Sequence, residues 1–387
     1  MKIALFTDGI YPYVVGGMQK HSYYLAKYLA KHGVHVDLYH CVPYGQPLVE
    51  TLEGFTNEEL KFIDQFCFYF PKGSRYPGHY IVESYAYSKL LYEAFLKYQA
   101  VDFVYAQGFT GWYYARQKSA VSLPPLGVNF HGLEMFQKAA TLRSRLEQYL
   151  FKIPVANVVR QSDYAFSLGG KLTPILERLT KDPQKVIPLS IGIGEGWIND
   201  EKVQYNTPNK IRQFVFIGRY ERRKGIEELS MVLDRVKESY DFIFHFIGPI
   251  PEEKKIFSEK VRYHGLVRSE EKIKQILREA DVLVSPSYSE GMPTVILEAM
   301  ASGCAVIASD VGAVCDEVDE SNGWLVRAGD TRQLEETIVS AIEMSFGQLA
   351  SKKSLSVQKI QNTFLWDDVA ERTIAFMQRA IEEKGRR

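Results

Sequence analysis

Residues 281–310 read DVLVSPSYSEGMPTVILEAMASGCAVIASD. Within this stretch, two apolar runs at 281–286 and 305–310 flank a segment at 293–302 with the composition of a helix. A strand, a helix and a strand in this order form a unit whose two strands lie parallel in one sheet. The stretch therefore predicts an α/β fold built on a parallel sheet.

The ends of this helix carry their own signals. Pro293 is favoured in the first turn of a helix, and Gly303 is favoured just after the last turn. The loop before the helix holds Glu290 and Gly291. Ligands of parallel sheets bind at the carboxyl ends of the strands, which is where this loop is expected to lie.

The same alternation continues over nearly the whole chain, in two series. The first series has expected strands at 3–7, 35–40, 102–107, 126–131 and 164–168, and a helix at 18–32. The second series has expected strands at 213–219, 242–248, 261–267, 281–286 and 305–310, and a further helix at 224–238. We predict an α/β protein of two Rossmann-like doubly wound domains, residues 1–190 and 191–364, with a linker at 184–197 and a C-terminal helix at 365–387 that packs back on the first domain.

Length and composition agree with this organisation. The chain has 387 residues and a mass of 44.3 kDa, more than one domain usually holds. No apolar run reaches the ~20 residues that cross a bilayer, and Asp8 comes too early for a signal peptide. The four cysteines are far apart, so we expect no zinc site, no disulfide framework and a reducing cytoplasm.

The charge of the chain is balanced overall but uneven along its length. Residues 1–190 hold 20 basic and 15 acidic side chains, a net of +5, and the remaining residues hold 27 and 32, a net of −5. A nucleic-acid-binding domain is usually more basic than this, so we expect no nucleic acid partner. The asymmetry fits either ordinary surface variation or a first domain that faces anionic or amphipathic acceptors.

Two carboxylates lie close to the start of the helix at 293–302. The free backbone N–H groups from Gly291 onward, with the positive end of the helix dipole, suit a diphosphate. Glu298 lies about 7.5 Å further along the helix axis than Pro293. One ligand can thus place its diphosphate over the helix start, a sugar beside Glu290 and a ribose near Glu298, because carboxylates accept hydrogen bonds from paired hydroxyls.

Two alternative roles for these carboxylates stay open. Glu290 could complement the helix dipole while Glu298 is a solvated residue. Paired carboxylates also serve glycoside hydrolysis. Their placement at a helix start suited to phosphate makes hydrolysis less attractive.

A second group of residues lies in FIGRYERRKGI, residues 216–226. The expected strand ends at Gly218, and four cations follow within six residues: Arg219, Arg222, Arg223 and Lys224. Arginine offers a planar fork to phosphate oxygens, and lysine adds a compact positive charge. A solvated basic face is the ordinary alternative, although a Gly-Arg pair that leaves a strand end is an unusual way to build one.

Weaker candidates follow strands of the first domain. Gly16 and Gly17 permit a positive φ angle and a close approach to phosphate or sugar, and a tight turn accounts for them equally well. His131 ends the run LGVNFH, where it could line a cleft or serve a structural role. His245 has no such context, so we assign it to the core or the sheet surface.

Several catalytic motifs are absent. The sequence lacks G-x-G-x-x-G after its first strand, G-x-x-x-x-G-K-[ST], G-x-S-x-G and H-E-x-x-H. Their absence weakens dinucleotide-dependent oxidoreductases, P-loop kinases, serine hydrolases and zinc proteases as interpretations. No Asp-x-Asp follows an expected strand, and no metal ion is expected.

The stretch SEGMPTVILEAMASG, with seven residues between Glu290 and Glu298, resembles the signature of the retaining glycosyltransferases of family four. This glycogen-synthase-like group has the GT-B fold, in which two Rossmann-like domains face each other across a cleft. The segment IGRYERRKGI resembles the family's Gly-Arg…Lys-Gly motif, and HGLV at 264–267 and SNGWLVRAGD at 321–330 fit the same pattern. The resemblance is strong over 213–330 and looser over 1–190.

The resemblance implies a role for each matching residue. Arg219 and Lys224 would bind the donor diphosphate and stabilise the departing charge. Glu290 would hold the transferred sugar, Glu298 the ribose, and His131 would line the reaction centre. The other implied donor contacts are Gly16, Gly17, Gly291, Met292, Pro293, Thr294, Gly265, Leu266 and Val267.

The chain departs from the family pattern in two places. The linker reads PLSIGIGEG where the family usually has Pro-Asn-Gly-(Ile/Val)-Asp, which puts the contacts of that Asn and Asp in doubt. Gln19 replaces a commoner acidic residue after the double glycine.

We therefore predict a cytoplasmic, metal-independent, retaining glycosyltransferase with a nucleotide-diphosphate sugar as donor and no cofactor. A sugar, a glycan or a lipid-linked hydroxyl would be the acceptor. A donor-binding protein without turnover, or a nucleotide-sugar epimerase or hydrolase, remains the alternative. The base (uracil, guanine or adenine) and the sugar stay open.

One segment bears on the acceptor. Residues 137–152, QKAATLRSRLEQYLFK, mix basic side chains with leucines. This mixture could bind a lipid-linked or membrane-surface acceptor, which would make the protein peripheral on the inner face of a membrane. It could equally be a core helix with basic flanks.

Overall fold

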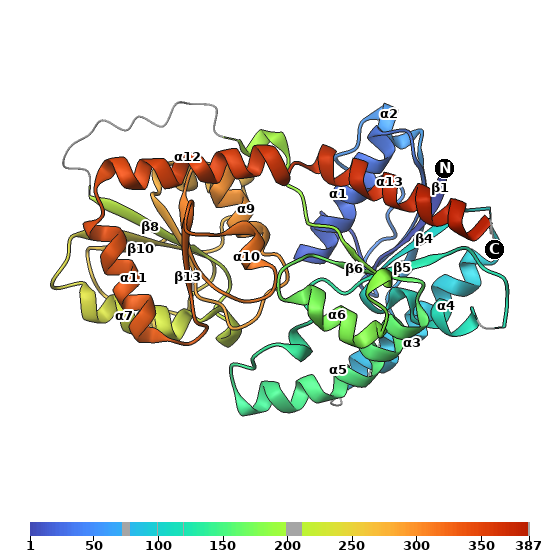
Figure 1. Cartoon of the computed structure of the whole chain (residues 1–387), viewed down its shortest axis with the longest axis horizontal. Coiled ribbons are helices and arrows are strands. Elements are labelled where there is room, and N and C mark those ends of the chain that lie inside the picture. Colours follow the sequence, from blue (N-terminus) through green and yellow to red (C-terminus); the bar gives the residue numbers. More distant parts are fainter. Residues whose placement is uncertain (72–77, 99, 119, 199–210, 386–387) are drawn as a thin grey trace. The chain divides into compact units, whose positions relative to one another are not determined.

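Figure 1 shows the computed structural model of the chain, which describes residues 1–71, 78–98, 100–118, 120–198 and 211–385. Within these ranges the strands form two separate sheets, and every strand pair in them is parallel. Helices flank each sheet (Figure 1). The predicted α/β class with two doubly wound sheets is thus confirmed.

The chain divides into two units. The first comprises 1–131, 146–192 and 366–387, and the second comprises 132–145 and 193–365. Residues 132–145 therefore group with the second unit, a grouping that the sequence did not suggest. The domain boundary after residue 190 stays a prediction.

The first unit is built on a seven-stranded sheet in the order β3-β2-β1-β4-β5-β6-β7. Its strands are β1 (Lys2–Phe6), β2 (His35–Val42), β3 (Ile63–Tyr69), β4 (Phe103–Gln107), β5 (Leu126–Asn129), β6 (Tyr164–Ser167) and β7 (Val186–Pro188). Its helices are α1 (Gly17–Lys31), α2 (Asn57–Leu60), α3 (His79–Phe95), α4 (Trp112–Gln117), α5 (Leu142–Gln161), α6 (Leu172–Thr180) and α13 (Trp366–Gly385). The first four residues of α5 group with the second unit.

Aromatic side chains fill the core of the first unit. The ring of Phe6 on β1 meets the rings of Tyr39, Phe95 and Tyr114 edge to face, at centroid distances of 5.1, 5.9 and 6.2 Å. The C-terminal helix α13 packs on α1, where Trp366 stacks on Tyr24. Tyr24, Tyr39 and Tyr114 thus contribute to the packing of this unit.

The second unit is built on a six-stranded sheet in the order β10-β9-β8-β11-β12-β13. Its strands are β8 (Arg212–Ile217), β9 (Phe242–Ile247), β10 (Val261–Tyr263), β11 (Val282–Ser285), β12 (Ala305–Ser309) and β13 (Gly323–Val326). Its helices are α7 (Ile226–Val236), α8 (Glu270–Glu279), α9 (Thr294–Ala301), α10 (Val314–Glu317), α11 (Thr331–Glu343) and α12 (Phe346–Thr363).

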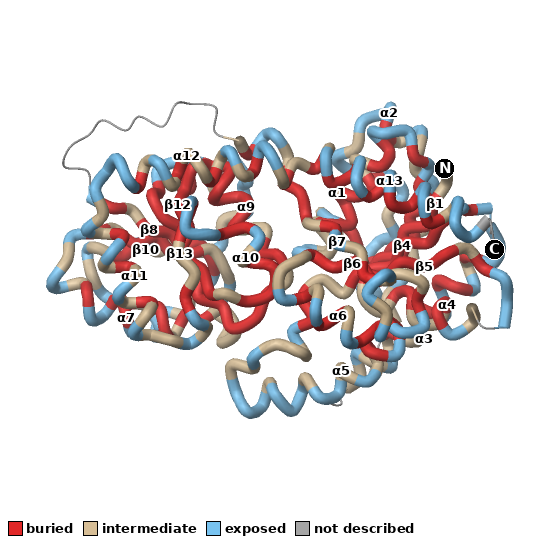
Figure 2. Tube along the Cα trace, viewed as in Figure 1, coloured by how far each residue is buried: buried red, intermediate tan, exposed pale blue. Residues whose placement is uncertain are grey.

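The burial pattern of the second unit accounts for its helices. Helix α7 buries Ile226, Leu229, Val232, Leu233 and Val236, a spacing that places one face on the sheet. Figure 2 shows the buried tube running through β8, β12 and β13, with exposed residues on the outer helices. Strand order reverses between β8 and β11, so the loops after these two strands flank the switch point where such sheets bind ligands.

Two expectations about elements need correction, and two strands were not expected. The predicted linker at 184–197 contains β7, the edge strand of the first sheet, because Val186–Pro188 still pairs with β6. The predicted strand at 261–267 ends at Tyr263, and 264–267 form a loop in which Gly265 has a φ of 64°. Strands β3 and β13 were not predicted, because β3 shows no clear alternation of polar and apolar residues and β13 is only four residues long.

Residues 55–98 are rich in Phe and Tyr, and part of this aromatic segment lies outside the described residues, as do 199–210 after the predicted linker. Within the described ranges, no helix combines the length and the apolar character needed to span a bilayer.

Candidate active site

The loop after β8 lies in close contact with the loop after β11 at a glycine, Gly225. Gly225 follows the short 3-10 turn Arg222–Lys224 and has a φ of 68°. A Cβ atom on this residue would lie 1.9 Å from the carbonyl oxygen of Pro286. Only glycine fits both the left-handed conformation and this close approach, so the sequence RRKG fixes the position of the preceding lysine.

Lys224 and Glu290 form the centre of the site. The ammonium Nζ of Lys224 lies 2.5 Å from Oε1 of Glu290, and the hydroxyl of Ser287 donates to the same oxygen at 2.8 Å. Nη1 of Arg223 lies 3.6 Å from the second carboxylate oxygen, Oε2. The Glu290 side chain is only 9% exposed, so these three partners satisfy a carboxylate that is largely withdrawn from water.

The backbone around Glu290 is packed from two sides. A Cβ atom on Gly312, in the loop after β12, would lie 2.2 Å from the Glu290 carbonyl oxygen, and the N–H of Ala313 donates to the Gly291 carbonyl at 2.8 Å. Within the same unit, Nε2 of Gln137 donates to the Glu290 carbonyl at 2.6 Å, and the Glu290 N–H donates to Oε1 of Gln137 at 3.4 Å. The loop is thus held through both its N–H and its carbonyl group.

Helix α9 begins directly after this loop. Its N-cap is Pro293, in an extended conformation, and the proline ring has no polar atom with which to cap the helix. The expectation that Pro293 occupies the first turn is therefore wrong by one residue, because its ψ of 111° is not helical. The predicted end at Gly303 is confirmed by its φ of 89°.

The remaining predicted donor residues line the same stretch. Met292 and Glu298 are buried, with 4% and 6% exposure, and Gly291 and Thr294 are partly exposed. Thr294 opens α9, and Glu298 follows one turn later on the same helix. The first amides of α9 and the carboxylate of the Lys224–Glu290 pair therefore belong to one short stretch of chain.

Arg219 pairs with Glu221 rather than with Glu290. Its guanidinium is 74% exposed and lies 2.8 Å from the Glu221 carboxylate. Glu221 also accepts from Nε of Arg223 at 3.0 Å. Arg219 is therefore an exposed cation, two residues beyond the end of β8.

The loop after β10 was predicted to contact the base. The carbonyl of Gly265 accepts from the Gly248 N–H at 2.8 Å, so this loop is tied to the end of β9. Leu266 is 63% exposed, and Val267 follows it. Just before them, Nε2 of His264 lies 2.9 Å from Nδ1 of His245, which confirms His245 as a buried residue of the sheet.

In the first unit, the double glycine lies between β1 and α1. Gly16 has a φ of 176°, and Gly17 starts α1, so neither has the positive φ that the sequence suggested. A Cβ atom on Gly16 would lie 2.1 Å from Oε1 of Gln19, the far end of a flexible side chain that can move aside. A Cβ built on Gly17 would meet none of the described atoms within 4 Å. Nε2 of Gln19 donates to Asp8 at 2.8 Å, and burial raises the pKa of Asp8 to about 6.

His131 lies two residues after β5, in a left-handed conformation with a φ of 52°. Its backbone N–H donates to the side chain of Asn129, and its Nε2 lies 2.8 Å from Oε1 of Gln107. Nε2 of Gln107 in turn lies 2.9 Å from Nδ1 of His21. Burial lowers the pKa of His131 to about 3, so this ring is neutral at physiological pH.

Several residues of this constellation escaped the sequence reasoning. Ser287 carries no spacing signal of its own, although it lies three residues before Glu290. Gln137 comes from a segment 153 residues away in sequence, so only the fold could reveal its contact. Glu317 of α10 is fully buried, and neither of its carboxyl oxygens has a hydrogen-bond partner among the described residues. Burial, and then the charges of Glu290 and Asp316, raise its pKa well above the usual range.

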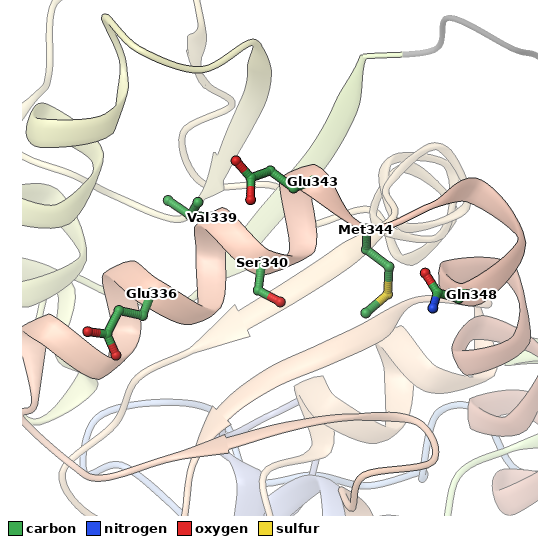
Figure 3. A pocket seen from close by; sticks show the side chains of 6 residues that line it. All are labelled: Glu336, Val339, Ser340, Glu343, Met344 and Gln348. Atoms are coloured by element: carbon green, nitrogen blue, oxygen red, sulfur yellow. The ribbon is translucent and has the colours of Figure 1, made fainter.

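A separate hollow of about 460 Å³ lies on α11 and the start of α12. Figure 3 shows the side chains that line it, which are Glu336, Val339, Ser340, Glu343, Met344 and Gln348. It shares no residue with the loops described above. The guanidinium of Arg212, at the amino end of β8, donates to the Met344 carbonyl, so this hollow lies at the opposite end of the strand from Lys224.

Among the residues that the structure describes, no group of three or more His, Cys, Asp or Glu side chains is arranged to hold a metal ion. Where β8 and β11 end, the cations Lys224 and Arg223 instead lie beside the Glu290 carboxylate. This arrangement can bind an anion and hydrogen-bond to hydroxyl groups.

Solved structures share this architecture over its whole length. Sucrose-phosphate synthase from Thermosynechococcus elongatus matches with a TM-score of 0.79 and 18% identity, over 99% of this chain and 99% of that one. Anabaena HepE, solved in complex with UDP, matches with a TM-score of 0.68 and 14% identity, over 98% and 100%. Together with the two doubly wound sheets, these likenesses define a GT-B protein.

Family models match both halves of the sequence. The model described as Glycosyltransferase Family 4 matches residues 15–188, and the model described as Glycosyl transferases group 1 matches residues 211–344. The chain belongs to the group 1 glycosyltransferases. A relative in Bacillus subtilis, named as the putative teichuronic acid biosynthesis glycosyltransferase TuaC, is 29% identical over 185 residues, which is 46% of this chain and 47% of TuaC. That match thus spans about half of the relative's length.

Proposed function

We propose that this protein transfers a glycosyl group from a nucleotide-diphosphate sugar to a hydroxyl of a sugar, glycan or lipid-linked acceptor, with retention at the anomeric carbon and without a metal ion. One observation carries the proposal. The buried carboxylate of Glu290, paired with the partly buried Lys224, lies in the loop directly before the N-terminus of α9, beside the switch point of the second sheet. This combination offers a cation, the free amides of a helix start and a carboxylate that can accept hydrogen bonds from hydroxyl groups, all within neighbouring loops.

The donor diphosphate would bind at the start of α9. The amides of Gly291 to Thr294 and the helix dipole favour an anion there. Lys224, whose side chain is 17% exposed, adds a positive charge. Arg219, with its exposed guanidinium, would complete the contact once the diphosphate arrives. These groups would stabilise the negative charge that grows on the leaving phosphate as the glycosidic bond breaks.

The two glutamates would hold the sugars of the donor. Glu290 keeps its carboxylate fixed through Ser287 and Lys224, so it can accept hydrogen bonds from hydroxyls of the transferred sugar. Glu298 would accept from the ribose hydroxyls. The loop at Gly265, Leu266 and Val267 would contact the base, mainly through its backbone.

The first unit would supply the acceptor side. Gly17 lacks a side chain that would fill the space beside it, and Gly16 precedes it at the start of α1. His131 is neutral and fixed by Gln107, so it would line the reaction centre as a hydrogen-bonding group rather than as a cation. The boundary between the acceptor-side and donor-side domains would lie after residue 190.

Retention would follow from attack on the face that the phosphate leaves. The acceptor hydroxyl would approach that face of a short-lived oxocarbenium ion, and the leaving phosphate would take its proton. The cations around Glu290 supply the charge stabilisation that this step needs. HepE, whose solved structure holds UDP, has the same fold and supports a nucleotide donor. We further propose that the protein works in the cytoplasm.

A turnover assay tests the proposal. Panels of UDP-, GDP- and ADP-sugars are incubated with glycan and lipid-linked acceptors, and the released nucleoside diphosphate and the product linkage are measured by mass spectrometry and NMR. We expect one donor to give an acceptor-dependent product with retained configuration, unchanged by EDTA. Product from water alone would indicate a hydrolase, and an epimerised donor without an acceptor would indicate an epimerase.

Site variants then locate the reaction. Lys224→Met and Glu290→Gln should each lower kcat/KM by about tenfold to a hundredfold, because each removes a charged contact worth about 1.5–3 kcal/mol. Arg235→Met is a matched control, since Arg235 of α7 forms an exposed ion pair with Glu335 at 3.0 Å. Survival of transfer within a few fold in either site variant would contradict the assignment.

A further inference from the structure

The first part of helix α5 exposes a row of large apolar side chains. Leu142, Leu146, Tyr149, Leu150 and Ile153 are 80, 71, 55, 47 and 71% exposed. At about 100° of rotation per residue, these five side chains fall within about 100° of the helix circumference. We call them the α5 apolar face.

The opposite side of the helix holds it to the protein. Val155, Val158 and Val159 are buried and lie about 140–240° around the helix from the α5 apolar face. Phe151 packs its ring against Tyr80 of α3 at 6.3 Å and against Phe109 at 6.4 Å. The apolar face is therefore turned away from the packed side, and Figure 2 shows this part of α5 largely as exposed tube.

Basic side chains border the α5 apolar face. Arg143 lies on one side of it, about 70° from its centre, and Arg145 and Lys152 lie on the other side, at about 90° and 110°. Glu147 is the acidic residue of the segment 142–153. Lys152 also lies over the ring of Tyr149, with its Nζ 4.5 Å from the ring centroid. An apolar stripe bordered by cations, with an aromatic residue near its edge, is the pattern of a helix that lies in a membrane interface.

We propose that the α5 apolar face docks onto an anionic lipid bilayer, with the helix lying flat in the interface. Charge favours this occupant over a second copy of the chain. A symmetric dimer through this face would bring the same basic border of each copy close to that of its partner. Anionic headgroups instead complement Arg143, Arg145 and Lys152, and the net charge of +5 over residues 1–190 has the same sign. This surface does not depend on donor binding.

Co-sedimentation with lipid vesicles tests the proposal. The full chain is mixed with vesicles of phosphatidylglycerol and phosphatidylcholine in equal parts, and with vesicles of phosphatidylcholine alone. We expect binding to the anionic vesicles that weakens as salt is raised, and at least tenfold weaker binding to the neutral ones. Equal binding to both kinds, or none to the anionic vesicles at low salt, would overturn the proposal.

Two double variants separate the apolar and the charged contributions. Leu146→Ser with Ile153→Ser should weaken binding about tenfold or more, since two exposed side chains no longer enter the acyl boundary. Arg143→Gln with Arg145→Gln should lower the binding and remove most of its salt dependence. Phe257→Ser, at a residue that is 89% exposed in the second unit, is the matched apolar control and should bind like the wild type.

Two further measurements keep the result specific. Circular dichroism and size-exclusion chromatography with light scattering verify that each variant is folded and report its oligomeric state. A wild-type dimer that the Leu146→Ser, Ile153→Ser variant loses would assign the face to self-association and overturn the proposal. Transfer to a soluble acceptor should be unchanged in these variants, so a failure of membrane binding and a failure of the proposed transferase activity are distinguishable.

Discussion

The coupling between Lys224 and Glu290 gives the sharpest quantitative prediction. Their charged atoms are 2.5 Å apart, and the side chains are 17% and 9% exposed. At an effective dielectric of about 20, two unit charges at this distance attract by about 7 kcal/mol, most of which the loss of hydration cancels. A net contribution of about 1.5–3 kcal/mol is usual for a hydrogen bond between charged groups. When Lys224 is substituted, Arg223, at 3.6 Å from the Glu290 carboxylate, should replace part of this stabilisation.

We therefore expect a coupling energy of about 1–2 kcal/mol in a double-mutant cycle of Lys224→Met and Glu290→Gln, measured as the free energy of unfolding in urea. Each single variant is destabilised because it leaves one charge without its partner, and the double variant loses less than the sum. The same cycle on Arg235→Met and Glu335→Gln, an exposed pair, should give less than about 0.5 kcal/mol. Additivity within about 0.3 kcal/mol at the Lys224–Glu290 pair would refute the reasoning.

Three further predictions concern stability. The pKa values of four buried histidines are lowered: to about 4 for His40 and His245, to about 3 for His131, and well below the usual range for His21. Below pH ~6.5 these histidines take up protons in the unfolded chain but not in the folded chain, so the free energy of unfolding in urea titrations should fall by up to about 1.4 kcal/mol per pH unit for each histidine. The raised pKa of Asp8 acts in the opposite direction and offsets part of this fall. A constant free energy of unfolding from pH ~7.5 to ~5 would contradict the prediction. Glu317→Gln should raise the free energy of unfolding at pH ~7 but not near pH ~4. The pKa of Glu317 is higher in the folded chain than in the unfolded chain, so this carboxyl group lowers stability only at pH values above the pKa of the unfolded chain. An equal effect of the substitution at both pH values would exclude this cause. Gly225→Ala should lower the thermal midpoint of unfolding more than Gly33→Ala does. Both glycines have a positive φ, but of the two only Gly225 would place a Cβ atom against a carbonyl oxygen, that of Pro286. Equal shifts in the two variants would show that the contact with Pro286 adds no further destabilisation.

The fold of the second unit could be predicted well from the sequence. Its strands are short, apolar and bounded by glycine, proline or charged residues, so β8, β9, β11 and β12 lie within a residue or two of their expected positions. Strand β13 was missed because the run GWLV is only four residues long, although turn residues bound it on both sides. The first unit was harder, since the aromatic segment that contains β3 and α3 shows no clear period.

The candidate site was predictable where its residues share one loop. Glu290, Gly291 and the start of α9 are neighbours in sequence, and Lys224 was found through its own motif. Contacts over long sequence distances were not accessible: the hydrogen bonds of Gln137 with the Glu290 backbone and of Gln107 with His131 depend on how loops meet in space. At the double glycine, Gly16-Gly17, the sequence instead predicted a local feature that the structure lacks. The predicted positive φ is absent, because Gly16 is extended at the N-cap of α1 and Gly17 already belongs to the helix.

A crystal structure of the protein with an intact nucleotide-diphosphate sugar would test the central claim most directly. We predict that the diphosphate lies within hydrogen-bond distance of Lys224 Nζ and of the first amides of α9, with the transferred sugar on the Glu290 carboxylate. A nucleotide sugar bound instead in the hollow on α11 and α12, with the Lys224–Glu290 pair unchanged, would contradict it.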